Sequence, residues 1–380
     1  MRVLQVSKFY PPVTGGIESV AWELTEGLNR AGVRTDVLCA AQTPRTVIEH
    51  REVGYSVTRA AQWGTWMSTS MAPTMAICLY GLARDHDIVH VHMPDPMAAA
   101  AVWMVRPRAS LVVHWHSDVI RQRLALKAYE PLQNWLLARA DAIIATSRPY
   151  AQASVALQRW QHKVAVIPIG ISDNSSRACS ERVAAIRQRF GRRHLVFALG
   201  RMTYYKGFDV LIEAAAALPE DCVVAIGGQG ELLDHYRIQV NRRGLAGKVH
   251  LLGHINDDEL ASHFEACDVF CMPSTVRAEA YGVAMVEAMV MGRPIVASDI
   301  PGSGVPWVNV HGHTGYNVPV RQPGALAAAL TQLLLDDELR AGMGAASRQR
   351  YLDEFGAPRM TGRMLELYRV LLAKPDRKHN

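Results

Sequence analysis

Long apolar segments are missing from this 380-residue sequence, which argues against a membrane-spanning helix. The two most apolar stretches, residues 63–82 and 93–113, are interrupted, the first by Pro73 and the second by three prolines and two arginines. The opening residues, MRVLQVSKFYPP, are typical of a strand and not of a signal peptide, because no small-residue cleavage site follows a long apolar run. We therefore expect a cytosolic protein.

Closely spaced cysteines are missing as well. The sequence has six cysteines but no CxxC pair, and their spacing is unlike that of a disulfide scaffold. They are Cys39, Cys78, Cys179, Cys222, Cys267 and Cys271. The pattern predicts reduced thiols with a structural role.

A clustered basic stripe, which a nucleic-acid-binding protein requires, is also missing. The net charge of +6 is uneven, since residues 1–169 hold 17 Lys and Arg against 12 Asp and Glu, leaving 24 against 23 for residues 170–380. The first half therefore has a net charge of +5 and the second half +1. We expect no nucleic-acid partner, but the basic first half suits an anionic membrane surface.

Short runs rich in Val and Ile alternate with amphipathic stretches along the chain, which is too long for a single core. The runs expected to be strands are residues 3–7, 35–40, 88–92, 111–116, 142–146 and 164–168, and then 195–199, 222–226, 249–252, 268–272 and 294–298. Residues 17–30 and 124–140 are expected to be helices, the second restarting at Pro131. The alternation predicts an α/β protein with two doubly wound parallel sheets, joined by a polar linker and entry helix over residues 172–193.

Residues 274–298 have the strongest functional pattern in the sequence. A predicted strand ends at Pro273, an apolar helix is expected from Val283, and a second buried strand follows. In such a unit the helix N-terminus lies at the carboxyl edge of a parallel sheet, where backbone N–H groups attract anions. Glu279 would precede this helix and Glu287 would lie within it. Either carboxylate could bind sugar hydroxyls, or both could be ordinary solvated charges.

The E-x7-E spacing, with the Tyr281–Gly282 pair after the first glutamate, resembles the signature of retaining GT-B glycosyltransferases of family 4. A paired-carboxylate hydrolase is disfavoured, because its carboxyl groups lie roughly 5–10 Å apart. Eight helical residues advance about 12 Å. The resemblance spans nearly the whole chain and implies two Rossmann-like domains facing a cleft. It implies an acceptor domain at residues 1–171, a nucleotide-sugar domain at 172–357, and a final helix at 358–380 that crosses back to the first domain.

A glycine pair follows the first strand of the first predicted domain, and two basic residues follow the first strand of the second. Gly15 and Gly16 open the first helix, but the G-x-G-x-x-G fingerprint of a dinucleotide site is absent. They could form an ordinary tight turn, whereas the resemblance places them against the sugar donor. In LGRMTYYKGFD, Arg201 and Lys206 could be surface charges or could clamp a diphosphate. The family pattern G-R-x4-K-G favours the clamp.

The resemblance adds further donor-binding positions beside the later strand ends. It places the base and ribose near the turns IGGQGELL and LLGHIND, where backbone groups would contribute much of the recognition. The positions it implies there, and around the two glutamates, are Gly228, His254, Ile255, Ala280, Tyr281, Gly282 and Val283.

Two pairs of histidines lie at i, i+2 on neighbouring predicted strands: His90 with His92, and His114 with His116. Each pair faces one side of its strand and could bind a metal. No cysteine or carboxylate completes a clear site, so we expect no metal. The resemblance implies that His116, at a strand end, contacts the donor sugar. We expect the other three histidines to have structural roles.

Taken together, the motifs predict a retaining hexosyltransferase that needs no cofactor or metal and uses a nucleoside diphosphate sugar. After SDIPG the chain departs from the commoner family pattern, and SGVPWVNVHGHTGYNVP resembles bacterial O-antigen, capsule or exopolysaccharide enzymes that often transfer mannose or rhamnose. A lipid-linked or oligosaccharide acceptor is expected. The alternatives are a nucleotide-sugar epimerase of similar shape and a catalytically silent sugar-nucleotide-binding protein.

The basic first half predicts reversible docking on the inner face of the cytoplasmic membrane through the first domain. Two segments of the first domain could make the contact. One is a basic stretch and the other an aromatic stretch, which could also pack in the core or line the acceptor groove. Their residues are Arg121, Arg123 and Lys127, and Trp63, Trp66 and Met67.

Overall fold

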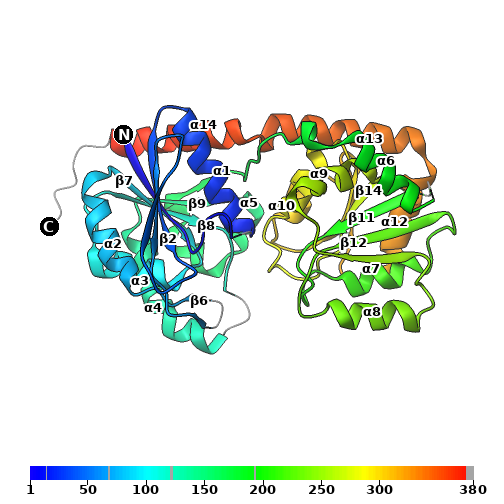
Figure 1. The fold of residues 1–380 in the computed structure, drawn as a ribbon, viewed down its shortest axis with the longest axis horizontal. Coiled ribbons are helices and arrows are strands. Elements are labelled where there is room, and N and C mark those ends of the chain that lie inside the picture. Colours follow the sequence, from blue (N-terminus) through cyan, green and yellow to red (C-terminus); the bar gives the residue numbers. More distant parts are fainter. Residues whose placement is uncertain (14, 67–68, 120–122, 192–193, 374–380) are drawn as a thin grey trace. The chain divides into compact units, whose positions relative to one another are not determined.

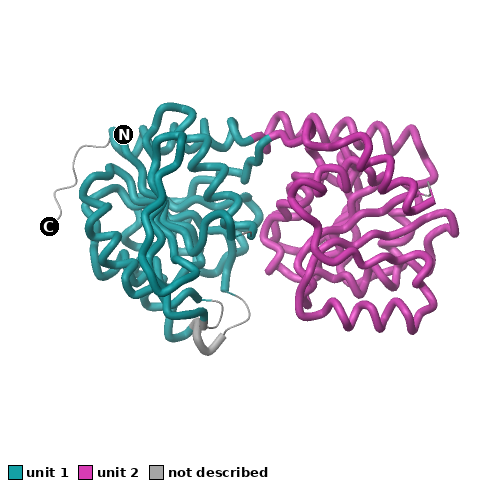
Figure 2. Tube along the Cα trace, in the orientation of Figure 1, with its two compact units in different colours: residues 1–172, 357–380 teal, residues 173–356 magenta. Residues whose placement is uncertain are grey.

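The computed structural model describes residues 1–13, 15–66, 69–119, 123–191 and 194–373. The chain divides into two compact units, shown in different colours in Figure 2. Unit 1 comprises residues 1–172 together with residues 357–380, and unit 2 comprises residues 173–356. Each unit contains one large sheet flanked by helices (Figure 1).

Unit 1 is built on an eight-stranded sheet with the order β10-β9-β8-β7-β1-β2-β4-β3. Its strands are β1 (Arg2–Val6), β2 (Arg34–Ala40), β3 (Val47–His50), β4 (Ser56–Ala60), β7 (Ile88–Met93), β8 (Ser110–Trp115), β9 (Ala142–Ala145) and β10 (Val164–Val166). All neighbours are parallel except β3 and β4. The predicted parallel sheet is therefore confirmed.

The sequence did not predict β3, β4 or the small hairpin of β5 (Thr65–Trp66) and β6 (Thr69–Ser70). β3 is an edge strand whose residues Val47 and Ile48 are exposed. Its antiparallel pairing is fixed partly by charge, because Arg59 on β4 donates from Nε to Glu49 Oε1 on β3 over 2.6 Å. Apolar periodicity does not detect a strand that is held in this way.

Helices cover both faces of this sheet. They are α1 (Gly16–Arg30), α2 (Thr74–Leu82), α3 (Pro96–Val105), α4 (Arg123–Arg139), α5 (Arg148–Ala153) and α14 (Ala357–Leu372), with 3-10 segments η1 (Ala83–Asp85) and η2 (Val155–Lys163). The predicted restart at Pro131 is wrong, since α4 continues through that residue. A proline removes one backbone donor, and the rest of the helix supplies enough hydrogen bonds to continue.

The last helix, α14, belongs to unit 1 and packs on α1 (Figure 1). The two helices approach closely at Gly27, where an added Cβ would lie 2.2 Å from Thr361 Oγ1. The entry to α14 is fixed by a hydrogen bond of 2.8 Å from Ala357 N to Ile171 O. Residues at opposite ends of the sequence therefore complete one core.

Unit 2 is built on a six-stranded parallel sheet with the order β13-β12-β11-β14-β15-β16. The strands are β11 (His194–Leu199), β12 (Cys222–Gly227), β13 (Val249–Gly253), β14 (Val269–Met272), β15 (Ile295–Asp299) and β16 (Gly315–Pro319). The first five match the sequence prediction. β16 was missed because Tyr316 and Asn317 interrupt its apolar character and Pro319 ends it.

The helices of unit 2 lie on both sides of its sheet (Figure 1). They are α6 (Ser180–Arg189), α7 (Phe208–Ala215), α8 (Leu233–Arg242), α9 (Asp257–Ala266), α10 (Val283–Val290), α11 (Val305–Val308), α12 (Pro323–Leu335) and α13 (Asp337–Arg350), with a 3-10 turn η3 (Ser175–Arg177) and a π-helical turn η4 (Tyr351–Phe355). One buried core lies between the sheet and α7, α8 and α12, and includes Phe208, Tyr236 and Leu330.

In both sheets the strand order reverses beside a central strand. β1 lies between β7 and β2 in unit 1, and β11 lies between β12 and β14 in unit 2. In doubly wound sheets, ligands bind outside the carboxyl ends of the strands at this switch point. A ligand site is therefore expected at the residues that follow β1, β8, β11, β12 and β14.

Candidate active site

An ion pair joins the loops that follow β11 and β14 in unit 2. Lys206 Nζ lies 2.6 Å from Glu279 Oε2, and Ser274 Oγ donates to the same carboxylate oxygen over 3.0 Å. The two charged side chains are only 13% and 11% exposed. Burial opposes the charging of Lys206, but the neighbouring Glu279 carboxylate outweighs it and raises the pKa of Lys206. The ammonium group is therefore held charged at the switch point of the sheet.

The loop that carries Glu279 is fixed by its neighbours. Thr275 N donates to Tyr205 O over 2.8 Å, and Gly304 N donates to Ala280 O over 2.8 Å. Ser303 Oγ also donates to Glu279 O. Glu279 itself is therefore positioned through both its backbone and its carboxylate, as a preorganised binding group requires.

Gly207 permits these two loops to meet. It precedes α7 with φ of +66°, and an added Cβ would lie 2.0 Å from Pro273 O. A side chain at this position would be strained by the backbone conformation and would also collide with the β14 loop. The glycine in the Lys206–Gly207 sequence is therefore needed for the position of the neighbouring lysine.

Glu287 is the fifth residue of α10, and its side chain is half-buried. Burial raises its pKa to about 7, the charge of Asp257 adds to the rise, and Lys206 opposes it. A carboxyl group with this pKa changes its charge near neutral pH. Ala280, Tyr281, Gly282 and Val283 lie between the two glutamates and lead into the N-terminus of α10.

Glycine turns bring the loops after β11 and β12 together at the same edge. At Gly228, with φ of +128°, an added Cβ would lie 1.9 Å from Gly200 O. Met202 N donates to Gln229 O over 2.8 Å, so the segment containing Arg201 is tied to this turn. Arg201 is exposed there, available for an anion.

The following strand end completes this part of unit 2. Gly228 N donates to Gly253 O over 2.6 Å, and His254 after β13 is exposed. Ile255 is buried, and its Cδ1 would lie 2.5 Å from a Cβ added at Gly227. The structure thus brings the predicted donor-binding residues of unit 2 to the carboxyl edge of one sheet.

In unit 1, Gly15 and Gly16 lie between β1 and α1. Gly15 precedes the helix in an extended conformation, and its carbonyl accepts from Ser19 N over 2.9 Å. An added Cβ at Gly15 would lie 2.3 Å from Glu18 Oε2, whereas Gly16 has open space. The absence of side chains leaves the backbone at this helix start accessible.

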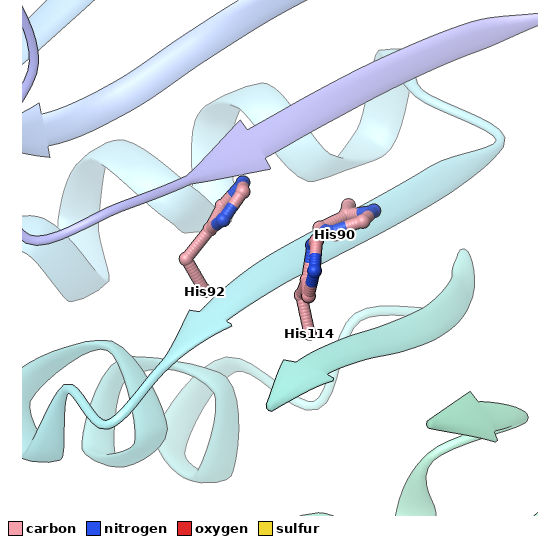
Figure 3. A group of neighbouring side chains, drawn as sticks. All are labelled: His90, His92 and His114. Carbon is pink, nitrogen blue, oxygen red and sulfur yellow. Dashed lines mark hydrogen bonds between the residues drawn. The ribbon is translucent and has the colours of Figure 1, made fainter. Parts of the chain in front are cut away.

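A buried cluster of histidines lies beneath the carboxyl edge of the unit 1 sheet. Figure 3 shows His90 and His92 on β7 and His114 on β8 with their rings gathered together. The His116 ring stacks on His114 with 4.1 Å between the ring centroids. The cluster also contains Gln5 of β1 and Tyr368 of α14, which the sequence analysis did not identify.

The cluster contains two hydrogen-bonded chains. In one, Gln5 Oε1 lies 2.8 Å from His92 Nε2, and His92 Nδ1 lies 2.8 Å from His116 Nε2. Since the glutamine oxygen accepts, His92 carries its proton on Nε2 and His116 donates from its own Nε2. This leaves His116 Nδ1 as the nitrogen without a proton.

The second chain begins at the C-terminal helix. Tyr368 Oη lies 2.6 Å from His90 Nδ1, and His90 Nε2 lies 3.2 Å from His114 Nδ1. Burial raises the pKa of Tyr368, so its hydroxyl stays protonated. Polar residues inside an apolar strand, such as Gln5 in RVLQV, were the available sequence signal for this cluster.

Burial holds all four histidines neutral. It lowers the pKa of His90 and of His116 to about 3, and it lowers the pKa of His92 and of His114 well below the usual value. The sequence prediction of structural histidines beside a strand-end His116 agrees with this arrangement.

Three of these residues could approach one metal ion, because ligand nitrogens of His90, His92 and His114 lie within 4.8 Å of one another. Both ring nitrogens of His90 and His92 are already in hydrogen bonds, and only His114 Nε2 has no partner among the described residues. A cation bound there would also lack a carboxylate from the described part of the chain. The arrangement favours a neutral hydrogen-bonded cluster.

Comparison with known proteins identifies the family. Residues 15–170 match the model "Glycosyl transferase 4-like domain", and residues 181–350 match "Glycosyl transferases group 1". The O-antigen chain mannosyltransferase C of Escherichia coli is 33% identical over 378 residues, which cover 98% of this chain and 99% of that protein. The chain belongs to glycosyltransferase family 4. The D-rhamnosyltransferase WbpZ of Pseudomonas aeruginosa is also 33% identical, over 94% of this glycosyltransferase and 93% of its own length.

A solved structure supports the fold. HepE of Anabaena in complex with UDP-glucose has a TM-score of 0.79 and 20% identity, over 97% of this glycosyltransferase and the whole of that chain. The glycosyltransferase therefore has the GT-B fold, as predicted, and is a hexosyltransferase. The epimerase and silent-binder alternatives are not favoured.

Proposed function

We propose that this enzyme moves mannose or a deoxyhexose such as rhamnose, with retention, from a nucleoside diphosphate sugar to a lipid-linked glycan. The product would belong to O-antigen, capsule or exopolysaccharide synthesis. Two relatives similar over nearly the whole chain support this choice, because one is named an O-antigen mannosyltransferase and the other a D-rhamnosyltransferase. GDP-mannose or a GDP-deoxyhexose is the preferred donor.

The observation that carries the proposal is the buried Lys206–Glu279 pair at the switch point of unit 2. In the proposed complex, Arg201 and Lys206 bind the donor diphosphate and stabilise the charge that grows on it as the glycosidic bond breaks. Glu279 accepts from a donor-sugar hydroxyl, and Glu287 accepts from the ribose. The ion pair keeps the lysine charged before the donor arrives.

The proposed reaction needs no protein nucleophile. The acceptor hydroxyl attacks the anomeric carbon from the face that the diphosphate leaves, and an oxygen of that phosphate takes the acceptor proton. The bond from sugar to phosphate breaks as the new glycosidic bond forms. His116, which burial holds neutral, accepts a hydrogen bond from the donor sugar through Nδ1. Because Lys206 and Arg201 stabilise the leaving group, we expect no requirement for a metal or another cofactor.

We propose that the enzyme works on the cytoplasmic face of the membrane as a peripheral protein. Among the described residues, none of the helices has both the length and the apolar composition needed to span a bilayer. Of the predicted contact residues, Trp63 is 79% exposed and Lys127 is exposed. The others lie outside the described residues or side chains: Trp66, Met67, Arg121 and Arg123.

Transfer assays with purified enzyme test the proposal. GDP-mannose, GDP-rhamnose, UDP-glucose and dTDP-rhamnose, each labelled in the sugar, would be incubated with and without a lipid-linked acceptor extract. We expect acceptor-dependent transfer from a GDP-sugar. An epimerised sugar in the absence of acceptor would contradict the proposed transfer reaction. Transfer only from a UDP-sugar would contradict the proposed GDP-sugar donor. A thermal-shift screen is a parallel check, since a ligand at a hundred times its Kd stabilises by about 2.7 kcal/mol.

A further inference from the structure

Two surface helices of unit 1 contain no charged residue. α2 has the sequence TMAICLYGL and α3 has the sequence PMAAAAVWMV, and the two pack against each other. Helices that are apolar all round are normally buried. Here Ile77 is 74% exposed and Tyr80 55% on α2, while Trp103 is 47% exposed and Met104 55% on α3. Exposed apolar groups of this size on two helices that pack together indicate an interaction surface.

A basic cavity adjoins these helices. Its volume is about 820 Å³, and it lies where η1 leads into β7 and where α3 leads into β8. Its lining includes Tyr80, Arg84, Val105, Arg106, Arg108 and Leu372. All three arginines are exposed. We call α2, α3 and this cavity the α2–α3 face.

The charges around the cavity favour an anionic partner. The Arg84 guanidinium lies 4.0 Å from the centre of the Tyr80 ring, which keeps it beside the apolar surface. Arg106 and Arg108 have no ion-pair partner among the described residues. Two acidic residues are near: Asp85 is exposed, and Asp87 accepts from Arg2 N over 2.7 Å and lies 3.7 Å from the N-terminal amine. The cavity therefore retains an excess of positive charge.

The position of this face suits a surface contact. Its cavity and the C-terminal end of α3 lie at the amino ends of β7 and β8, whereas His116 follows the carboxyl end of β8. Six residues of strand separate the two ends, or about 20 Å. A partner bound at the α2–α3 face would leave the carboxyl edge of the unit 1 sheet free for substrate.

We infer that the α2–α3 face docks on the anionic surface of a lipid bilayer, with lipid phosphates beside Arg84, Arg106 and Arg108 and with Ile77, Trp103 and Met104 at the interfacial layer. Arginine beside exposed tyrosine and tryptophan is a combination suited to that layer. This docking rests on the membrane association proposed above, and it places the contact at the α2–α3 face instead of at the segment containing Lys127. It does not depend on the transfer reaction, because lipid binding can be measured alone.

Vesicle flotation of the full-length enzyme tests this inference. We expect the wild type to float with phosphatidylglycerol-rich vesicles, to float poorly with neutral phosphatidylcholine, and to be released by high salt. Each basic residue near an anionic leaflet changes binding about fivefold, so Arg84→Gln/Arg106→Gln/Arg108→Gln should weaken it on the order of a hundredfold. The matched control, Arg237→Gln/Arg242→Gln/Arg243→Gln, changes the net charge equally through exposed arginines in unit 2.

Two substitutions of exposed isoleucines test the apolar contribution to vesicle binding separately from the contribution of charge. Ile77→Ser should weaken flotation severalfold, whereas Ile238→Ser, at a 50% exposed isoleucine of unit 2, should not. Equal flotation of the two arginine triples would overturn the inference. So would loss of binding only in Arg121→Ala/Arg123→Ala/Lys127→Ala, although membrane docking itself would then stand. A concentration-dependent dimer that Ile77→Ser abolishes, without vesicle binding, would assign this face to a second copy of the chain and overturn it also.

Discussion

Units 1 and 2 have related sheets but hold their buried polar residues in opposite ways. Unit 1 places four histidines side by side and burial keeps them neutral, so their orientation depends on hydrogen bonds with Gln5, which accepts from His92, and with Tyr368. Unit 2 places Lys206 against Glu279 and keeps the ammonium charged. Neutral rings suit contact with an uncharged sugar, whereas a fixed cation suits a diphosphate. The contrast implies different responses of the two units to pH and to substitution.

The largest expected effect is a loss of stability in unit 1 on acidification. A buried histidine with a lowered pKa binds a proton only after unfolding, so stability falls as the pH drops below about 6.5. Asp95, whose pKa burial raises to about 6, acts in the opposite direction. Four histidines against one carboxyl give a loss of about 4 kcal/mol between pH 7.5 and 5.5. Hydrogen exchange read by mass spectrometry would measure it for each unit.

Unit 2 is the internal control for that measurement. Burial lowers the pKa of His263, so this residue makes unit 2 less stable on acidification. Burial raises the pKa of Glu287 to about 7, so its contribution to the stability of unit 2 is lost as the pH rises from about 4.5 to 7. The two effects oppose each other, so unit 2 should change little between pH 7.5 and 5.5. Equal destabilisation of both units would refute the contrast between them.

Removing the charged pair tests the other side of the comparison. Lys206→Met, like Arg201→Ala, should lower transfer by roughly 10²–10³, because the leaving diphosphate loses a charge-assisted contact. Lys206→Met should also destabilise unit 2 by about 3 kcal/mol, because Glu279 then keeps a buried charge without its partner. Steady-state kinetics and thermal denaturation would be compared with Lys206→Met/Glu279→Gln, which should regain stability but not activity. Wild-type turnover in both single variants would refute the clamp.

The two glutamates should differ in what they affect. Glu287→Gln should weaken binding of the bare nucleotide about tenfold, as expected for loss of a charged hydrogen-bond acceptor. Glu279→Gln should instead lower turnover and leave nucleotide binding nearly unchanged. In calorimetry the wild-type affinity should rise between pH 6 and 8, because Glu287 ionises near pH 7, and Glu287→Gln should show no such rise. Unchanged nucleotide affinity in Glu287→Gln would exclude the ribose role.

The smallest effect is expected at Gln5, which acts through His92 on His116. Gln5→Leu should lower turnover about threefold, because His116 loses its fixed tautomer while its position is kept by packing. Gln5→Glu should favour a protonated His92 and so introduce a titration of His92 that is absent in the wild type, where burial keeps this ring neutral. ¹⁵N spectra of the imidazole rings would report both changes. A proton on Nδ1 of His116 in the wild type would contradict the tautomer assigned from the Gln5–His92–His116 chain.

The sequence predicted the repetitive parts of the fold well. Strands buried on both faces give Val- and Ile-rich runs, so the structure contains all eleven predicted strands. It also contains strands that were not predicted, namely β3, β4, β5, β6 and β16, and β3 is held partly by the Arg59–Glu49 pair. In the candidate site, loop residues such as Lys206 and Glu279 could be identified from motif spacing. The ion pair between Lys206 and Glu279 could not be predicted, because it depends on the close approach of two separate loops that Gly207 permits. Gln5 and Tyr368 were missed since their partners lie far away in the sequence.

The return of α14 to unit 1 has a consequence for synthesis on the ribosome. Unit 2 is one continuous segment, residues 173–356, and can complete its fold as soon as that segment has emerged. Unit 1 begins first but finishes last, because Gly27 meets Thr361 and His90 meets Tyr368 only after α14 has been translated. A nascent chain that stalls before residue 357 therefore exposes the first half of the protein to chaperones and proteases, although every residue of that half has already been made.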